Sequence, residues 1–188
     1  MLLIQMTGPS GVGKTTIANR TRELLAESGL NAIVIDENKY RRLKWKDFGL
    51  CRKAREKRIK KMGLSACRLA LDGAIVILDA INPFERVRRA LKLKNPRVRT
   101  VSVTCDMKAL MRRAIQKIYH IGSLPNDHPD KVYNLVGVNH PYEVPMDADF
   151  RLNTDDESPE DSAFRLASFI KREFEEFQKK LAINLALS

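Results

Sequence analysis

Short apolar runs alternate along this chain with longer segments in which apolar residues recur every three or four positions. An alternation of these two periods is typical of strands and helices that follow one another in turn. The unbroken apolar run at 74–78, which ends at Asp79, is typical of a strand in a parallel sheet covered on both faces. Strands are predicted at 2–6, 31–36, 74–79, 99–106 and 149–154.

Helical periodicity fills the intervals between these strands. After the first strand, Ile17, Leu24 and Leu25 mark the apolar side of an amphipathic helix. Further helices are predicted at 53–71, after Pro83, at 107–119 and from Ser158 onward. The sequence therefore predicts an α/β fold, in which five parallel strands form a sheet with helices on both faces.

The last predicted helix begins with a clear N-terminal signal. Pro159 follows Ser158, and Glu160 and Asp161 place two acids in the first turn, where they suit the positive end of the helix dipole. Its apolar face is predicted to consist of Phe164, Leu166, Phe169, Ile170, Phe174 and Phe177.

The chain is predicted to form one domain over residues 1–188, since this length is enough for a single full core. Gly, Pro, Asn and His residues concentrate between positions 121 and 145, which is typical of a loop. We interpret residues 119–145 as a lid at the edge of the sheet.

The segment Gly8–Thr15 reads GPSGVGKT and matches the phosphate-binding loop, with four residues between two glycines and then Lys-Thr. It lies between a predicted strand and a predicted helix, as that motif requires. Backbone N–H groups would surround phosphate oxygens, Lys14 would reach the β- and γ-phosphates, and Thr15 would bind Mg²⁺. The predicted nucleotide-binding residues are Gly8, Ser10, Gly11, Val12, Gly13, Lys14, Thr15 and Thr16. The fold prediction narrows to a P-loop kinase that uses ATP and Mg²⁺.

Two acids stand at the carboxyl ends of predicted strands, where ligands bind in such sheets. Asp36 ends the second strand and is predicted to be catalytic, either by accepting a proton from an acceptor hydroxyl or by holding the water shell of Mg²⁺. The alternative is a helix N-cap. Asp79 is predicted to be a magnesium ligand of the Walker B type, and its alternative is a turn at the strand end.

A formal net charge of +11, from 34 Lys and Arg against 23 Asp and Glu, favours an anionic partner. Basic residues concentrate between positions 41 and 61. Most of them are expected to be solvated, while Arg41 and Arg55 are predicted to bind the anionic group of the acceptor. Arg113, near the start of the lid, is predicted to stabilise charge on the transferring phosphate, with a basic helix end as the alternative.

Other features narrow the class of protein. No apolar stretch approaches the roughly 20 residues of a membrane helix, and the chain enters its first strand without space for a signal peptide. The three cysteines are scattered, without the spacing of a zinc site. These features predict a cytoplasmic protein without a membrane partner.

Several segments resemble the adenylyl-sulfate kinases. Asp36–Arg41 resembles the motif Asp-Gly-Asp-x-x-Arg of that family, and Ile81–Phe84 resembles Ile-Ser-Pro-Tyr. Pro141–Pro145 matches Pro-Tyr-Glu-x-Pro, and Leu152–Thr154 resembles Leu-Asp-Thr. The family transfers the γ-phosphate of ATP to the 3′-hydroxyl of adenylyl sulfate, and the resemblance implies this reaction or one on a related nucleotide-like acceptor.

The resemblance also implies site residues, and some of them depart from the family pattern. Leu50 and Leu135 stand where the family stacks two phenylalanines on adenine. In the other motifs, Asn38 replaces an acid, Glu37 replaces a glycine and Asn82 replaces a serine. Thr154 and Arg113 are implied on the nucleotide side. The implied acceptor-binding residues are Asp36, Asn38, Arg41, Leu50, Arg55, Asn82 and Leu135.

Two other functions remain open from the sequence. A polynucleotide 5′-kinase also carries an Asp and then an Arg beyond its second strand, although aromatics form only 6% of this chain and no basic stripe is interleaved with them. A nucleotide-binding module without transfer activity is the second alternative. A small anionic substrate is the expected partner, nucleic acid is the less favoured one, and a homodimer is possible.

Overall fold

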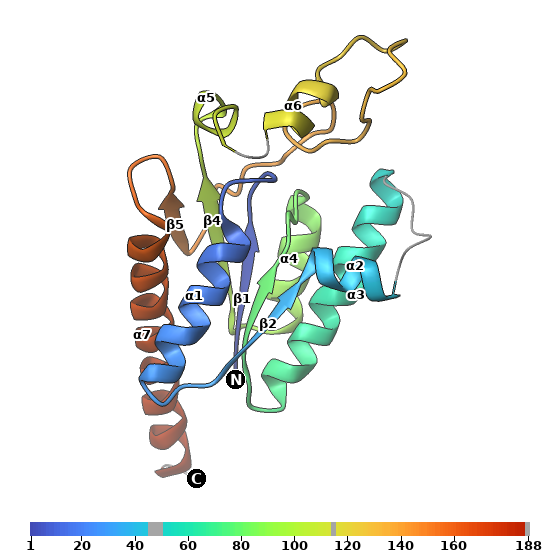
Figure 1. The fold of residues 1–188 in the computed structure, drawn as a ribbon. Helices are drawn as coiled ribbons and strands as arrows, with labels where there is room; N and C mark the ends of the chain where they lie inside the picture. Colours follow the sequence, from blue (N-terminus) through green and yellow to red (C-terminus); the bar gives the residue numbers. More distant parts are fainter. Residues whose placement is uncertain (45–50, 114–115, 187–188) are drawn as a thin grey trace.

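The computed structural model describes residues 1–44, 51–113 and 116–186, and it contains one sheet of five parallel strands (Figure 1). The strand order is β2-β3-β1-β4-β5. The strands are β1 (Leu2–Thr7), β2 (Ala32–Asp36), β3 (Ile75–Asp79), β4 (Val98–Thr104) and β5 (Phe150–Asn153). The predicted fold class is confirmed.

The register of the sheet brings the two predicted strand-end acids together. β3 lies between β1 and β2, and Asp36 pairs in register with Asp79. Because all five strands run the same way, their carboxyl ends meet at one edge, which is where ligands bind in this architecture. The phosphate-binding loop follows β1 at that same edge.

Helices cover both faces of the sheet, as Figure 1 shows: α1 and α7 lie on one side, and α3 and α4 on the other. The helices are α1 (Lys14–Glu27), α2 (Glu37–Lys44), α3 (Arg52–Leu71), α4 (Glu85–Lys94), α5 (Met107–Leu110), α6 (Gln116–Gly122) and α7 (Pro159–Ala186). Among the described parts of the chain, no helix is long and apolar enough to cross a membrane.

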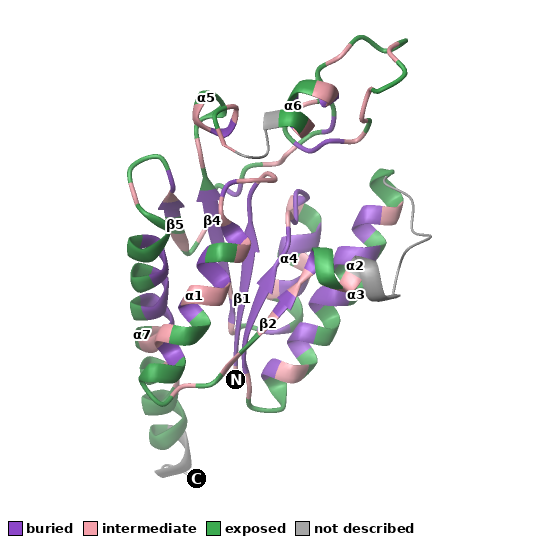
Figure 2. Cartoon of the chain, in the orientation of Figure 1, coloured by how far each residue is buried: buried purple, intermediate pink, exposed green. Residues whose placement is uncertain are grey.

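Each face of the sheet has its own apolar core, and the strands β1 and β3 are buried throughout (Figure 2). On the side of α3, Met62 and Ala66 pack in the apolar core against the sheet. Gly63 is also on the buried side of this helix. A Cβ atom at Gly63 would lie 2.4 Å from Leu91 Cδ1, so a larger residue there would force the Leu91 side chain to move.

The helix α7 begins as its sequence predicts. The Ser158 hydroxyl accepts a hydrogen bond from the Asp161 N–H at 3.1 Å, which caps the first turn. Leu166, Phe169 and Ile170 are buried against the core, as expected. The prediction is wrong for Phe164, which is 65% exposed because it lies off the face that packs on α1 and β5.

The single helix predicted at 107–119 is also wrong. The structure has the short helix α5 and then α6, which starts at Gln116. The last turn after α5 tightens, since the N–H groups of Arg112 and Arg113 donate to the carbonyls three residues earlier. Beyond α6, the segment up to β5 is mainly irregular, with one isolated bridge between Val136 and His140.

Candidate active site

The phosphate-binding loop is held in place by backbone contacts. The Gly8 N–H donates to the Ile81 carbonyl at 3.2 Å, and a Cβ atom at Gly8 would lie 2.3 Å from the Val103 carbonyl oxygen. Gly13 adopts a left-handed conformation with φ of 97° just before α1. A side chain is excluded by contact at Gly8 and disfavoured by conformation at Gly13, so the pattern of glycines follows from the geometry of the loop.

Lys14 lies inside this loop. Its ammonium group donates to the carbonyls of Gly8 at 2.9 Å and Pro9 at 2.8 Å. Burial lowers the pKa of Lys14, while the carboxylates of Asp79 and Glu37 act in the opposite direction. The cation is therefore held by fixed dipoles at the point where phosphate oxygens bind in loops of this kind.

Thr15 and Asp79 form the group best suited to a magnesium ion. The Thr15 hydroxyl donates to Asp79 Oδ2 at 2.6 Å, and Asp79 is 3% exposed. Burial raises the pKa of Asp79, against the opposing effects of the Thr15 hydrogen bond and the Lys14 charge. A hydroxyl and a carboxylate are oxygen ligands that Mg²⁺ prefers, so the donor set fits the predicted metal.

One cavity of about 470 Å³ opens from the loop toward α3 and the predicted lid. The loop, the end of β3, the start of α2, one side of α3 and the segment 132–136 all contribute walls. The predicted site residues that line it are Ser10, Gly11, Gly13, Lys14, Thr15, Thr16, Asn38, Arg55, Asp79 and Leu135. The structure thus brings the predicted phosphate site and part of the predicted acceptor site together.

Asp36 makes the contacts of a helix N-cap, which is the alternative to its catalytic role. Its Oδ1 accepts hydrogen bonds from the backbone N–H groups of Asn38 at 2.7 Å and Lys39 at 3.3 Å, at the start of α2. Asp36 is not among the described residues that line the cavity. Its catalytic role and its metal role stay predictions, since capping by one oxygen does not conflict with either.

Arg55 connects α3 to the lid segment. The side chain is buried and lines the cavity, and its Nη2 donates to the Asn134 carbonyl at 2.7 Å. Leu135, which follows this contact, is 7% exposed and also lines the cavity. The predicted acceptor contacts Leu50 and the Arg41 side chain lie outside the described residues.

Arg113 and Thr154 lie beside the loop rather than in the cavity lining. Arg113 Nη1 donates to Thr154 Oγ1 at 3.1 Å and to the Gly11 carbonyl at 3.4 Å, and Nη2 donates to the Thr154 carbonyl at 2.6 Å. Gly8 and Val12 also lie behind the lining, with Val12 fully buried. The contacts of Arg113 connect the chain before α6 to the loop and to the end of β5.

The start of the lid segment is tied to the loop by Tyr119. Its hydroxyl donates to the Ser10 carbonyl at 2.6 Å, and the residue is 1% exposed. Burial raises the pKa of Tyr119 to about 12. This tyrosine is therefore a neutral hydrogen-bond donor at physiological pH, and it fixes the lid segment against the loop.

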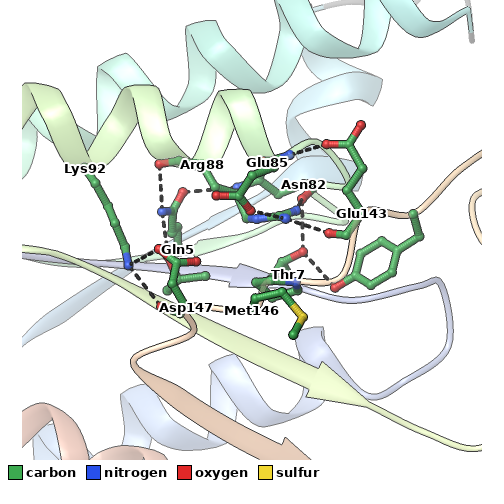
Figure 3. A network of polar contacts seen from close by, with 12 residues as sticks. Gln5, Thr7, Asn82, Glu85, Arg88, Lys92, Glu143, Met146 and Asp147 are labelled. Atoms are coloured by element: carbon green, nitrogen blue, oxygen red, sulfur yellow. Dashed lines mark hydrogen bonds and ion pairs between the residues drawn. The ribbon is translucent and has the colours of Figure 1, made fainter.

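Asn82 does not occupy the position expected for an acceptor contact. It is fully buried behind the cavity lining, and its Nδ2 donates to Gln5 Oε1 at 3.2 Å (Figure 3). Its backbone is left-handed with φ of 41°, and its carbonyl accepts from Arg88 Nη1 at 2.8 Å. In this structure, Asn82 shapes the turn after β3 and gives no support to the acceptor-binding prediction.

Arg88 joins that turn to the end of the lid segment, as Figure 3 shows. The side chain is 1% exposed, and its Nη2 donates to the Glu143 carbonyl at 2.6 Å. The Glu143 carboxylate in turn accepts from the Glu85 N–H at 2.6 Å. The segment that contains the Pro-Tyr-Glu-x-Pro match is thus anchored on α4.

Two residues of the cavity, Glu37 and Arg58, are not among the predicted site residues. Both line it and both are buried, and Arg58 Nη2 donates to Glu37 Oε1 at 3.0 Å. One signal was present: Arg55, Arg58 and Met62 recur at helical spacing with the apolar residues of α3 that face the sheet. The basic composition of this segment, in contrast, is typical of a solvated helix face.

Comparisons with known proteins agree with this geometry. The family model for adenylylsulphate kinase matches residues 1–153. An adenylyl-sulfate kinase of Chloroflexus aurantiacus is 31% identical over 154 residues, which cover 82% of this chain and 80% of the relative. Another, from Bacillus pumilus, is 31% identical over 174 residues, which cover 90% of this chain and 84% of that protein.

A solved structure shares the fold. The APS kinase of Mycobacterium tuberculosis, in complex with AMPPNP and APS, superposes with a TM-score of 0.80 at 23% identity. The match covers 90% of this chain and 97% of that one. At this identity the likeness concerns the architecture alone.

Proposed function

The chain belongs to the adenylyl-sulfate kinase family. We propose that it transfers the γ-phosphate of ATP to a small anionic acceptor. It is an ATP-dependent phosphotransferase, and its acceptor is the hydroxyl of a small anionic compound. Adenylyl sulfate is the leading candidate, and a related nucleotide-like compound is the alternative. A member of this family would release ADP and leave the phosphate on the acceptor.

The observation that carries the proposal is the single cavity shared by the two halves of the site. Lys14 and Thr15 line it on the phosphate side, and Arg55 lines it from α3. A volume of about 470 Å³ lies within the range typical of small-ligand pockets. An acceptor bound near Arg55 would therefore be enclosed in the same space as the γ-phosphate, which favours a small acceptor over a polynucleotide.

Each residue of the site has a role that follows from its position. Lys14 binds the β- and γ-phosphates, and Thr15 with Asp79 would hold Mg²⁺, which when bound neutralises phosphate charge during transfer. Arg55 binds the anionic part of the acceptor. Asp36, at the end of β2, orients the acceptor hydroxyl or takes its proton.

The lid segment completes the site. Tyr119 fixes its start to the loop, and Arg88 fixes its end to α4. Leu135 forms part of the cavity wall between these anchors. An enclosed site favours transfer to the acceptor, because water would otherwise compete for the phosphoryl group.

The test is a transfer assay with the full chain, ATP and Mg²⁺. ADP release is measured with adenylyl sulfate, with its guanine and cytosine counterparts, and with a single-stranded oligonucleotide as acceptors. We expect adenylyl sulfate or one of its counterparts to be phosphorylated and the oligonucleotide to remain unmodified. Phosphorylation of the oligonucleotide alone would refute the proposal in favour of a polynucleotide kinase.

The control variants are Lys14→Ala and Lys60→Ala. Lys14→Ala removes a preorganised charge that is commonly worth about 3 kcal/mol or more in the transition state, so we expect a loss of at least roughly 100-fold in turnover. Lys60 is exposed on α3, and its loss is expected to leave turnover unchanged. Turnover by Lys14→Ala within a few-fold of the parent would show that this loop is not the catalytic phosphate site.

A further inference from the structure

The positive charge of this chain is concentrated in one part of the fold. Residues 52–97 carry 14 Lys and Arg against 4 Asp and Glu, so they hold +10 of the net charge of +11. This part of the chain includes α3 and α4, which lie side by side on the same face of the sheet (Figure 1). The strand between them in sequence, β3, is buried, so the two helices present the charge to solvent.

The exposed cations of α3 lie along one side of the helix. At 3.6 residues per turn their positions fall within an arc of about 100°, and at 1.5 Å per residue they extend over about 22 Å. The opposite side of α3 carries Met62 and Ala66, which pack in the apolar core. We call these exposed cations the basic stripe, which consists of Lys53, Lys57, Lys60, Lys61 and Arg68.

The acids near the basic stripe do not neutralise it. Glu56 is the only acid in α3, and it is buried, where its carboxylate forms ion pairs with Arg52 and with Arg86 of α4. The next acid along the chain, Asp72, stands at the C-terminal cap of α3, four residues after the stripe ends. The side of α3 that faces solvent therefore carries a single sign of charge.

The cations of α4 extend this basic surface. Its one acid, Glu85, is engaged in an ion pair on the same helix. The ion pair of Arg86 with Glu56 joins the two helices, so the basic stripe and the cations of α4 belong to one surface. The exposed cations of α4 are Arg86, Arg89 and Lys94.

Like charges meet within the basic stripe. Lys57 lies four positions after Lys53 and four positions before Lys61. Side chains at this spacing are neighbours on a helix, and like charges there repel and lower its stability. Solvated helix faces commonly alternate charges of both signs. A bound polyanion would relieve the repulsion, which favours a binding surface over a solvated face.

The side chains between these cations narrow the class of partner. Neither α3 nor α4 contains Phe, Tyr or Trp, whereas single-stranded nucleic acid is bound largely by stacking of its bases on aromatic rings. Leu64 and Leu71 are exposed, but they lie on the side of the basic stripe, so α3 has no separate apolar face that could insert into a membrane. A row of cations along a helix is suited instead to the regularly spaced phosphates of a duplex.

We propose that the basic stripe, with the exposed cations of α4, binds the phosphate backbone of duplex nucleic acid without reading its sequence. The surface is separate from the cavity, because no residue of the stripe is among the described residues that line it. The cations of α3 that do line the cavity, Arg55 and Arg58, are buried. The proposal goes beyond the proposed function and does not depend on it, since the bound duplex is a partner and not an acceptor of phosphate.

The test measures binding of a labelled DNA duplex to the full chain by fluorescence anisotropy. A duplex of about 20 base pairs is longer than the stripe, since each base pair adds about 3.4 Å. A non-hydrolysable ATP analogue and Mg²⁺ are present at saturation, so that the phosphate-binding loop is occupied. If the stripe contacts three or more phosphates, affinity is expected to fall by roughly 40-fold or more between about 50 and 200 mM salt. Two duplexes of unrelated sequence are expected to bind equally.

The decisive comparison is between two triple variants that lose the same charge. The stripe variant combines Lys53→Gln, Lys60→Gln and Arg68→Gln. It is expected to bind the duplex at least roughly tenfold more weakly at about 50 mM salt, with the slope of log affinity against log salt shallower by about 2–3.

The matched control combines Arg22→Gln, Lys179→Gln and Lys180→Gln, at exposed positions of α1 and α7. It is expected to bind the duplex within about threefold of the parent. All six substituted positions are exposed, and melting curves check that both variants are folded. Arg89→Gln with Lys94→Gln, on α4, is a second test variant and is expected to make the slope shallower by about 1–2.

The proposal is overturned if the stripe variant and its control weaken binding equally, because net charge alone would then attract the duplex. It is also overturned if the duplex binds only when the ATP analogue is left out, since the nucleic acid would then occupy the cavity. Tighter binding of a single strand of the same length would refute the assignment to a duplex. Binding to vesicles of phosphatidylserine and phosphatidylcholine, with none to the duplex, would assign the surface to a membrane.

Discussion

The Thr15 hydroxyl donates a 2.6 Å hydrogen bond to the Asp79 carboxylate, and this contact joins the phosphate-binding loop to the end of β3. The two residues are 64 positions apart in sequence, and the parallel sheet brings them together because β1 and β3 are direct neighbours. Asp79 is buried, and burial raises its pKa. Burial of the ionised carboxylate therefore lowers the stability of the fold. The proposed role of Asp79 in Mg²⁺ binding would explain why the fold accepts this cost.

Asp79→Asn is expected to stabilise the fold and to impair transfer. The raised pKa means that the unfolded chain releases the proton of Asp79 first as the pH rises above 3.8, so stability is lost between that pH and the folded-state pKa. The amide of asparagine at this position is uncharged, so its burial does not carry this loss of stability. We expect a higher melting temperature for the variant at pH 7, and a difference that shrinks as the pH falls toward 3.8.

The same variant tests the metal role of Asp79. An amide can still accept the Thr15 hydrogen bond but binds Mg²⁺ more weakly than a carboxylate. We expect a higher Mg²⁺ concentration for half-maximal turnover and a maximal rate lower by roughly 100-fold. An unchanged Mg²⁺ dependence would contradict the metal role, and a melting temperature that falls at pH 7 would contradict the electrostatic argument.

Asp36→Asn separates the chemistry of Asp36 from its helix cap. Asparagine caps helices about as well as aspartate, so the contacts to the N–H groups of Asn38 and Lys39 are retained. We expect turnover to fall by roughly 100-fold or more, with ATP affinity changed less than twofold, because the group acts on the acceptor and not on the nucleotide.

Asp36→Ala is the matched comparison, since it removes the cap as well. Its additional cost is expected in the free energy of unfolding, at about 1 kcal/mol. If Asp36→Asn lowers ATP binding as steeply as it lowers turnover, the acceptor role of Asp36 is wrong. If it leaves turnover unchanged, Asp36 is a helix cap alone.

The sheet could be predicted from the sequence because strands that are buried on both faces show their pattern locally. The run that ends at Asp79 is an example, and its strand begins within one residue of the prediction. The edge strand that ends at Asp36 is only partly buried, but its apolar run also places its start within one residue. The break between α5 and α6 could not be predicted, because the Arg113 side chain contacts the Gly11 carbonyl of the loop and the Thr154 carbonyl after β5. These contacts depend on the assembled fold.

The phosphate side of the site could be predicted because one continuous motif carries it. The acceptor side could be predicted only in part, because it is assembled from separate segments: Asn38, Arg55 and Leu135 line the cavity as expected, and the pairing of Glu37 with Arg58 was not foreseen. Arg58 belongs to a run of cations that has the composition of a solvated helix face, and only its phase relative to Met62 indicates burial. The carboxylate that pairs with it, Glu37, comes from another helix. Asn82 stays a prediction as an acceptor contact, and its side chain is buried and donates to Gln5 in this structure.

Arg88→Gln is expected to loosen the end of the lid segment on α4, where the Glu143 carboxylate keeps its contact with the Glu85 N–H. The variant would leave the partly buried Glu143 carbonyl without its Arg88 donor, while the buried Asn82 carbonyl keeps only the Thr7 hydroxyl at 3.0 Å. The expected cost is about 1–3 kcal/mol in the free energy of unfolding. Urea unfolding measures this loss, and limited proteolysis reports whether cleavage within 123–145 becomes faster. The control is Arg89→Gln, an exposed neighbour on the same helix. Equal unfolding free energies for the two variants would show that Arg88 does not anchor the lid.

Recognition of the base of the acceptor is expected to depend on Leu135. This side chain lines the cavity and packs closely on α6, where a Cβ atom at Gly122 would lie 2.7 Å from Leu135 Cδ2. A phenylalanine at this position has no space on the side of α6, so its ring would extend into the cavity. The base of a bound nucleotide-like acceptor could then stack on it.

We therefore expect Leu135→Phe to tighten the binding of adenylyl sulfate by roughly two- to tenfold, and Leu50→Phe with Leu135→Phe to tighten it further, by about 1–3 kcal/mol in total. The parent protein, with leucine at both positions, is expected to show little preference among the bases. A competition assay with adenylyl sulfate and its guanine and cytosine counterparts measures both effects. A strong preference of the parent for adenine, or a double variant that binds adenylyl sulfate no better, would show that the base of the acceptor does not lie against these two positions.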